Sequence, residues 1–215
     1  RKVNFSAEVP RGGLLTMGSV LKVTTDGFET SPILRGAWIS KNIVGTPLSP
    51  PPESVPALEP EHGEAKTLKE QIDQHKSNKT CYACHKSIDG YGFALESFDA
   101  TGGWRDQYRV KQAHGGTFQY RPQGYFKRGA PVDASGEIDD ASFQDIFGLK
   151  KVLLSNEGKL AYNFGKKFFE YAHGGKPDLS QRLQLWDFLG KNSGNLRLRT
   201  LMTHVLANST NAKEK

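Results

Sequence analysis

The sequence predicts a mainly α-helical fold with many loops, and three observations lead to this prediction. Apolar residues recur at three- and four-residue spacing through the last third of the chain. Residues that favour helix starts and helix ends flank these stretches. The 23 glycines and 11 prolines among 215 residues are typical of irregular backbone between elements. We find no internal repeat.

Composition places the chain among ordinary globular proteins. It is 36% hydrophobic and 24% charged, and its length is sufficient for a sizeable core. No apolar run is long enough to cross a bilayer. The net charge of +6 and the pI near 9.2 favour an acidic partner: a redox protein, an anionic polysaccharide or a neighbouring domain of a longer parent chain. The basic residues are scattered, which disfavours nucleic acid and is also compatible with solvated helix faces.

The N-terminal segment, residues 1–46, is expected to be ordered from Gly12 to Gly45. Ser31 and Pro32 form a helix start, with a capping hydroxyl followed by proline at the first position. This helix is expected to end at Gly45. The preceding stretch, 14–23, is apolar enough for a short helix or a buried strand, and its periodicity does not distinguish them.

A Pro-rich segment, residues 47–60, interrupts this order. It predicts extended polyproline-like chain, either a free linker or a strap across the surface. Thr67 and Glu70 then form a capping box that opens a helix running to about Lys76. From residue 85 to about residue 129 the chain is expected to be mostly loop.

The C-terminal region, residues 129–215, predicts four helices. It opens with four carboxylates that favour a solvated turn but leave a calcium site open: Asp133, Glu137, Asp139 and Asp140. The helices are expected at 143–154 with Ser142 as cap, at 159–172 ending at Gly174, at 179–190 and at 196–207. Their expected apolar faces are Leu160, Phe164, Phe168 and Tyr171; Leu183, Trp186 and Leu189; and Leu198, Leu201, Met202 and Val205.

The two cysteines of the chain, Cys81 and Cys84, are followed directly by His85. Cys-x-x-Cys-His is the attachment signal for haem c. Two thiols at this spacing match the two vinyl groups of haem, to which they add as thioethers. The adjacent imidazole then ligates the iron. The motif predicts one covalent haem c on Cys81 and Cys84, with His85 as proximal ligand.

Three other uses of the motif explain it less well. A zinc site needs a further ligand and would have to use the adjacent Cys84 and His85 together. A thioredoxin-like dithiol follows a strand, whereas a polar helix and a turn precede Cys81 here. A disulfide between the cysteines leaves His85 without a role.

The motif refines the fold class to a cytochrome c-like haem core formed by residues 61–128. The N-terminal segment and the Pro-rich strap are expected to wrap this core, and the C-terminal helical bundle to close the haem pocket. Aromatic residues after the motif are candidate walls of the pocket. Arg105 and Arg109 either pair with haem propionates or lie in solvent.

The sixth iron ligand decides what the haem does, because methionine, histidine or an empty position give different chemistry. Met17 is the first candidate for the distal ligand, since it lies in a compact apolar segment beside Gly18. His75 is the alternative, on the helix that leads into the motif. Other candidates are better explained by packing, surface exposure or helix ends, and His204 is left open: Met202, His62, His114, His173 and His204.

Several blocks of the chain resemble, in content and order, the C-terminal haem-binding part of the large exported cytochromes typical of planctomycete bacteria. The resemblance joins one family domain from about Arg11 to Tyr108 with a second from about Pro131 to Ser209. Some family members have IDPxGF where this chain has IDGYGF, so a proline that braces the backbone after the proximal histidine is missing. The blocks are RGGLLTMGSVLKVTTDG, TSPILRGAW, the proline run, LEPEHGEAKTLKEQIDQHK, CYACHKSIDGYGFALESFDATGGWRDQY and PVDASGEI.

The resemblance implies export to the periplasm or beyond, a covalent haem and membership of a multidomain chain. The family has been linked to polysaccharide handling by the company of its domains, and no reaction is demonstrated for it. The chain begins with Arg, which we interpret as a mature fragment of a longer protein.

Three functions follow as hypotheses. The first is a mono-haem module for one-electron transfer. The second is a haem enzyme, a peroxidase or an oxidoreductase on carbohydrate-related substrates, with an open or displaceable sixth ligand. The third is a module that holds an anionic polymer on a basic surface while the haem is structural.

Overall fold

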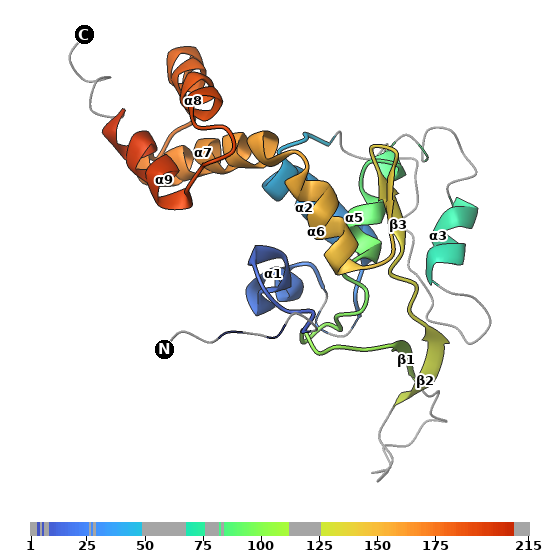
Figure 1. Cartoon of the computed structure of the whole chain (residues 1–215). Helices are drawn as coiled ribbons and strands as arrows, with labels where there is room; N and C mark the ends of the chain where they lie inside the picture. The colour runs from blue at the N-terminus through green and yellow to red at the C-terminus, as the bar shows by residue number, and fades with distance from the viewer. Residues whose placement is uncertain are drawn as a thin grey trace. The chain divides into compact units, whose positions relative to one another are not determined.

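The computed structural model describes residues 4, 6, 9–25, 27, 29–48, 68–75, 82, 84–111 and 126–208 of the chain. Helices form most of the regular structure in these ranges (Figure 1). The predicted mainly α fold class is thus confirmed, while the cytochrome c-like core stays a prediction. None of the described helices is both long and apolar enough to span a bilayer.

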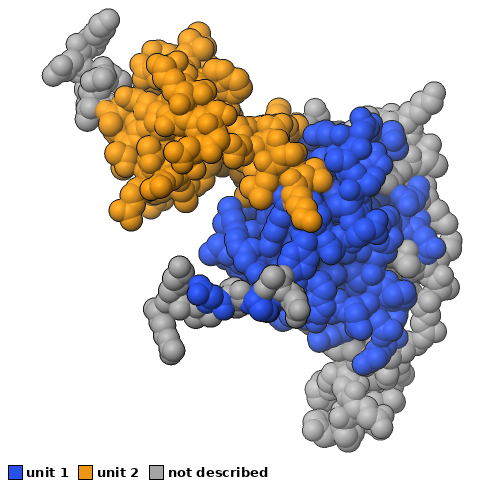
Figure 2. Space-filling view, viewed as in Figure 1, with its two compact units in different colours: residues 1–39, 48–150 blue, residues 40–47, 151–215 orange. Residues whose placement is uncertain are grey.

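The chain divides into two compact units (Figure 2). Unit 1 comprises Arg1–Ile39 and Leu48–Lys150, and unit 2 comprises Ser40–Pro47 and Lys151–Lys215. The predicted boundary between residues 128 and 129 falls inside a strand of unit 1, residues 126–131, which pairs with residues 107–111. The predicted Pro-rich strap lies outside the described residues apart from its first two positions.

The stretch at 14–23, which the sequence left between helix and strand, is helical. A 3₁₀ turn, η1 (Leu14–Thr16), precedes the helix α1 (Gly18–Val23). Leu15, Val20 and Leu21 are buried, which accounts for the apolar character of the segment.

The helix predicted from Ser31 to Gly45 is confirmed, with one irregularity. α2 (Pro32–Ile39) continues directly into a π-helical segment, η2 (Ser40–Val44), and Gly45 follows at φ 81°. The Ser31 hydroxyl accepts a hydrogen bond from the Leu34 amide at 3.2 Å, as a capping residue does.

Unit 1 is organised around a backbone-to-backbone contact between α2 and the short helix α5 (Asp89–Phe93). A Cβ atom on Gly36 would overlap the Ile88 carbonyl, and one on Gly92 would overlap the Pro32 carbonyl. Two glycines therefore allow the helices to approach more closely than any side chain permits. The contact fixes the chain that leaves the Cys-x-x-Cys-His motif.

A buried ion network lies next to this contact. Arg35, fully buried on α2, donates to Glu96 Oε1 at 3.0 Å and to the carbonyls of Leu95 and Phe98 at 2.7 Å each. Glu96, also fully buried, accepts from Thr30 at 2.6 Å and from Arg105 at 2.9 Å. Desolvation lowers the pKa of Arg35, partly offset by the charge of Glu96.

The network corrects the prediction for Arg105. Its side chain is 10% exposed and forms an ion pair with Glu96, so it does not lie in solvent. Arg109 is 65% exposed and lies 3.8 Å from Asp99, as a solvated arginine does. No local pattern in the sequence indicates that Glu96 is buried between two guanidinium groups.

The region from residue 85 to 129, expected to be mostly loop, contains regular structure as well. Besides α5, the strands β1 (Gln107–Lys111) and β2 (Phe126–Pro131) pair antiparallel. A second antiparallel pair follows, β3 (Gly136–Ile138) with β4 (Ala141–Phe143). Their short alternating stretches are too brief to give a periodic signal in the sequence.

The pairing of β4 also corrects the start of the next helix. α6 (Ile146–Leu154) begins three residues later than predicted, because Ser142 and Phe143 are in the strand. Asp145, not Ser142, supports the first turn, since its Oδ1 accepts from the Gly148 amide at 2.8 Å.

Unit 2 contains the three remaining predicted helices, α7 (Glu157–His173), α8 (Leu179–Lys191) and α9 (Leu198–Ala207). Gly174, in the left-handed conformation, ends α7 as predicted. Asp178 and Gln181 form a capping box at the start of α8. The helices bury a core of Phe169, Leu185, Leu189, Leu201 and Val205.

The apolar faces predicted for α7 and α8 were wrong in part. Tyr171 is 87% exposed, Leu183 60% and Trp186 63%, whereas Phe169 and Leu185 are buried instead. Apolar residues occupy more than one side of each helix, so the sequence does not indicate which side contacts a neighbour. Leu198 on α9 is also exposed, while Leu201 and Val205 are buried as predicted.

The α2–α5 contact gives a first prediction. Gly92→Ala should lower the free energy of unfolding by about 2 kcal/mol or more, because the methyl group overlaps the Pro32 backbone rather than a flexible side chain. Gly18→Ala, on a helix of the same unit with open space around it, is the matched control and should change stability by less than about 1 kcal/mol. Urea unfolding of both variants measures the difference in their free energies of unfolding. Equal urea midpoints for the two variants would contradict the close contact at Gly92.

Asp99 gives a prediction about pH. Its Oδ1 accepts from the Thr101 amide at 2.9 Å, the Thr101 hydroxyl at 2.7 Å and the Gly103 amide at 2.8 Å. Burial acts to raise the pKa of Asp99, but these hydrogen bonds and the charge of Arg109 outweigh it and lower the pKa. A carboxylate whose pKa is lowered by folding contributes stability above the pKa of the unfolded state, about 3.9.

Asp99→Asn should therefore lose about 1–2 kcal/mol of stability near neutral pH. The loss should shrink as pH falls through the folded-state pKa, where the wild-type carboxylate is protonated as well. Chemical unfolding at a series of pH values tests this, with the exposed neighbour Asp106→Asn as control. A loss that stays constant down to acid pH would show that the charge of Asp99 is not responsible.

Candidate functional site

The second half of the Cys-x-x-Cys-His motif lies in a helical turn that leads into α5. The Lys86 amide donates to the Tyr82 carbonyl at 2.9 Å, and the Ile88 amide to the His85 carbonyl at 3.1 Å. The Ser87 hydroxyl donates to the Cys84 carbonyl at 2.8 Å. These bonds hold the backbone of Cys84 and His85 in a defined conformation at the entry to α5.

His85 is anchored by a carboxylate. Its Nδ1 lies 2.8 Å from Asp89 Oδ1, four residues further on, and both residues are buried. Residues at this spacing lie on the same side of a helical chain, so the turn and α5 bring them together. An ionised carboxylate only accepts hydrogen bonds, so toward an ionised Asp89 the imidazole would donate from Nδ1 and leave the lone pair on Nε2.

A pocket of about 390 Å³ lies beside His85 and Asp89. One wall comes from the motif and α5, and the other from the β3–β4 hairpin. The backbone of α5 at Gly90 lies against the Glu137 carbonyl of β3, which fixes the distance between these walls. The described lining residues, besides His85, Asp89, Gly90 and Glu137, are Lys69, Tyr82, Lys86, Phe93, Ser135, Gly136, Asp139, Ser142, Phe143 and Gln144.

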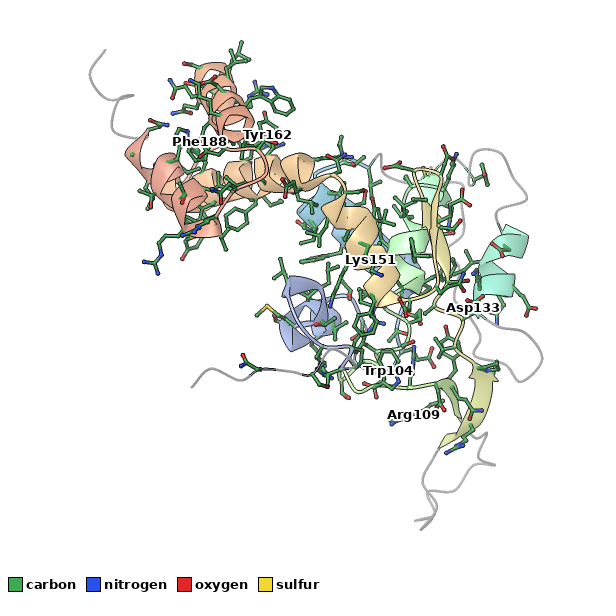
Figure 3. The ribbon with its side chains drawn as sticks, in the orientation of Figure 1. Trp104, Arg109, Asp133, Lys151, Tyr162 and Phe188 are labelled. Atoms are coloured by element: carbon green, nitrogen blue, oxygen red, sulfur yellow. The ribbon has the colours of Figure 1, made fainter. Side chains whose placement is uncertain are left out.

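Lys69 links the helix α3 (Leu68–His75) to the pocket. Its Nζ donates to Asp133 Oδ2 at 2.9 Å and to the Ser135 hydroxyl at 2.6 Å, and it lies 5.4 Å from the centre of the Phe93 ring. Figure 3 labels Asp133, which lies beside α3. Burial acts to raise the pKa of Asp133, but the hydrogen bonds from Ser135 and Lys69 outweigh it and lower the pKa.

The hairpin end of the pocket is a tight turn. Asp139 and Asp140 have φ values of 50° and 64°, as in the two-residue turns that join antiparallel strands. Both side chains are exposed, as predicted for a solvated turn, whereas Glu137 lies in β3 and Asp133 is paired with Lys69. Burial, with the charge of Asp139, raises the pKa of Tyr91 to about 12, and this phenol therefore stays neutral near the pocket.

The structure brings together some of the predicted site residues. Cys84 is exposed and directly precedes His85, while Cys81 lies outside the described residues. Met17 is 51% exposed at the start of α1 and is not among the residues that line the pocket. His75 ends α3, and its side chain lies outside the described part. Met17 and His75 as distal ligands stay predictions.

Two further histidines have clear structural partners. His173 Nδ1 lies 2.9 Å from the Phe169 carbonyl at the end of α7, in agreement with its predicted place at a helix end. His204 stacks on Phe188 with ring centres 3.9 Å apart, and burial lowers its pKa. His62 and His114 lie outside the described residues.

Sequence reasoning missed Asp89 and Lys69 as site residues. The signal for Asp89 was present: a carboxylate four residues after a ligand-type histidine has the spacing of a hydrogen-bonded pair on a helix. Lys69 had no such signal, because its partners Asp133 and Ser135 are 64 and 66 residues away in the sequence.

Residues 11–108, slightly less than half of the chain, match the family model PSCyt3, described as a protein of unknown function (DUF1588). The match includes Cys81, Cys84, His85 and Asp89, and its bounds agree with the first family domain predicted from about Arg11 to Tyr108. Neither a curated protein nor a solved structure matches the chain. Among the residues that the structure describes, no group of three or more His, Cys, Asp or Glu side chains forms a metal-type cluster.

Proposed function

We propose that the chain is a mono-haem c-type cytochrome module that carries one covalent haem c on Cys81 and Cys84, with His85 as the proximal iron ligand. The observation that carries the proposal is the His85–Asp89 hydrogen bond beside the pocket, directly after the attachment motif. When bound, the haem supplies an iron that changes its oxidation state by one electron.

The residues around the pocket are compatible with this group. Tyr82, Phe93 and Phe143 offer aromatic surface for a flat apolar macrocycle. Lys69 and Lys86 offer cations for its carboxylate groups. The pocket is only partly enclosed, so part of a large ligand would extend beyond it.

Asp89 acts on His85 rather than on the haem itself. A carboxylate that accepts from Nδ1 fixes the tautomer and the ring orientation, and it makes Nε2 a stronger donor to a metal. This role explains why a carboxylate is buried at the first residue of α5.

Electron transfer outside the cytoplasm is the function that we propose for the module, within a longer exported protein. The resemblance to the exported planctomycete cytochromes and the haem c motif support this proposal. A redox protein or a neighbouring domain of the parent chain is the proposed partner.

Catalysis by an open haem is the second candidate, because the strongly donating His85–Asp89 pair favours the ferric state that peroxidase-type chemistry starts from. The sixth ligand separates the two functions. Carbon monoxide or cyanide that binds on mixing would favour the enzyme, whereas a low-spin six-coordinate iron would favour the carrier.

Covalent attachment of haem is the first test. The full chain, exported together with a cytochrome c maturation system, should gain the mass of one haem and give a haem c spectrum in alkaline pyridine. A Cys81→Ser/Cys84→Ser variant should lose the covalent mass because both thioether bonds are removed, while Ser87→Ala keeps it. If matured wild-type protein has the mass of the bare polypeptide, the proposal is wrong.

The role of Asp89 is tested by the reduction potential. Asp89→Asn keeps an acceptor for Nδ1 but removes the charge that strengthens the ligand, so ferric iron should lose stabilisation. We expect the potential to rise by about 59 mV or more, a tenfold change in the one-electron equilibrium.

Asp139→Asn is the matched control, since it removes one carboxylate charge at the same pocket without a bond to His85. Its potential should rise by much less. Equal shifts in the two variants would mean that Asp89 acts through net charge alone and does not position the histidine.

A further inference from the structure

The exposed side of α8 carries three large apolar side chains in a row. Leu179, Leu183 and Trp186 are 63%, 60% and 63% exposed. Their spacing of four and then three residues places them on one side of the helix. The row that they form is about 10 Å long at 1.5 Å per residue. We name these three residues the α8 stripe. Such a stripe on a surface helix is typical of a face that packs against another protein.

The stripe is rigidly supported. The Trp186 ring lies edge-to-face on Tyr162 of α7, with ring centres 5.4 Å apart and an interplanar angle of 83°. On the other side of the helix, Leu185 and Leu189 are buried in the core of unit 2. Figure 3 shows Tyr162 between α7 and α8. A preformed aromatic anchor of this kind loses little conformational entropy when it is covered.

The charge of unit 2 indicates the chemistry of what covers the stripe. Its described residues include ten Lys and Arg but four Asp and Glu, an excess equal to the net charge of +6 of the whole chain. Two cations lie near the stripe: Arg182 precedes Leu183 on α8, and Lys166 lies 5.1 Å from the ring centre of Tyr162, which contacts Trp186. The nearby carboxylate of Asp187 is paired with Lys191 at 2.6 Å.

These observations distinguish between three possible partners of the stripe: a second copy of the chain, a membrane surface and an acidic protein. A second copy of the chain would bring two strongly positive units together, which disfavours self-association. A helix that lies on an anionic membrane is rich in Lys and Arg on its polar side, whereas α8 has Arg182 and Lys191, and Lys191 is paired with Asp187. An acidic protein surface with an apolar ridge matches both the stripe and the charge.

We propose that the α8 stripe is a docking site for an acidic partner protein that presents an amphipathic helix. Leu179, Leu183 and Trp186 contact the apolar side of that helix, and Arg182 and Lys166 face its carboxylates. This inference is independent of whether the chain binds haem.

The test uses the full chain and a defined probe. The probe is a fluorescently labelled synthetic amphipathic helix with Leu on one side and Glu on the other, compared with the same peptide carrying Lys in place of Glu. Fluorescence polarisation should show saturable binding of the Glu peptide, at least about tenfold tighter than the Lys peptide, and weakened by salt.

A double variant, Leu179→Gln/Leu183→Gln, should weaken binding of the Glu peptide by about tenfold or more. Both residues are exposed and glutamine favours helix, so the fold should be retained, which circular dichroism checks. Tyr171→Gln is the matched control, because it removes a large exposed side chain of unit 2 outside the stripe.

Four outcomes would overturn the proposal. Binding of the Lys peptide as tight as that of the Glu peptide would remove the electrostatic argument. An unchanged affinity of the double variant for the Glu peptide would show that the stripe is not the binding site. Retention on vesicles that contain phosphatidylserine, without peptide binding, would indicate a membrane surface. Self-association in sedimentation that the double variant abolishes would indicate a second copy of the chain.

Discussion

The close contact between α2 and α5 is the constraint on which the rest of unit 1 depends. At Gly36 and Gly92 the two backbones touch, and no other residue type fits there without displacing main chain. A contact of this kind has few alternative registers, because a shift along either helix would replace glycine by a larger residue. It therefore fixes where α5 begins, and with it the position of Asp89 relative to His85.

The buried ion network adds specificity to the same contact. Two guanidinium groups and one carboxylate are removed from water. A buried ion network of this kind contributes little more to the free energy of unfolding than apolar packing would. Its effect is to exclude other arrangements, since Arg35 has to meet Glu96 and the carbonyls of the chain between Leu95 and Asp99 at once. α2 is thereby joined to the segment that follows α5, and the candidate site lies on a framework held on both sides.

The two units differ in what their surfaces offer. Unit 1 contains the pocket beside His85, whose described lining includes cations, carboxylates and aromatic rings. Unit 2 carries an excess of positive charge and the α8 stripe. Its two described histidines, His173 and His204, pack against the rings of Phe169 and Phe188. We therefore propose the haem site in unit 1 and the partner contact in unit 2.

The sequence by itself determined what local chemistry specifies: the Cys81, Cys84 and His85 motif, the helix start at Ser31, the helix end at Gly174 and the mainly helical fold class. Caps, glycines and attachment motifs act within a few residues, so they can be recognised without a fold. Only the tertiary structure decided that Glu96 is buried between Arg35 and Arg105, that Lys69 reaches Asp133, and that Trp186 faces outward while Leu185 faces inward. Each of these depends on a partner far along the chain or on which of several apolar sides finds a neighbour, and no spacing within one segment carries that information.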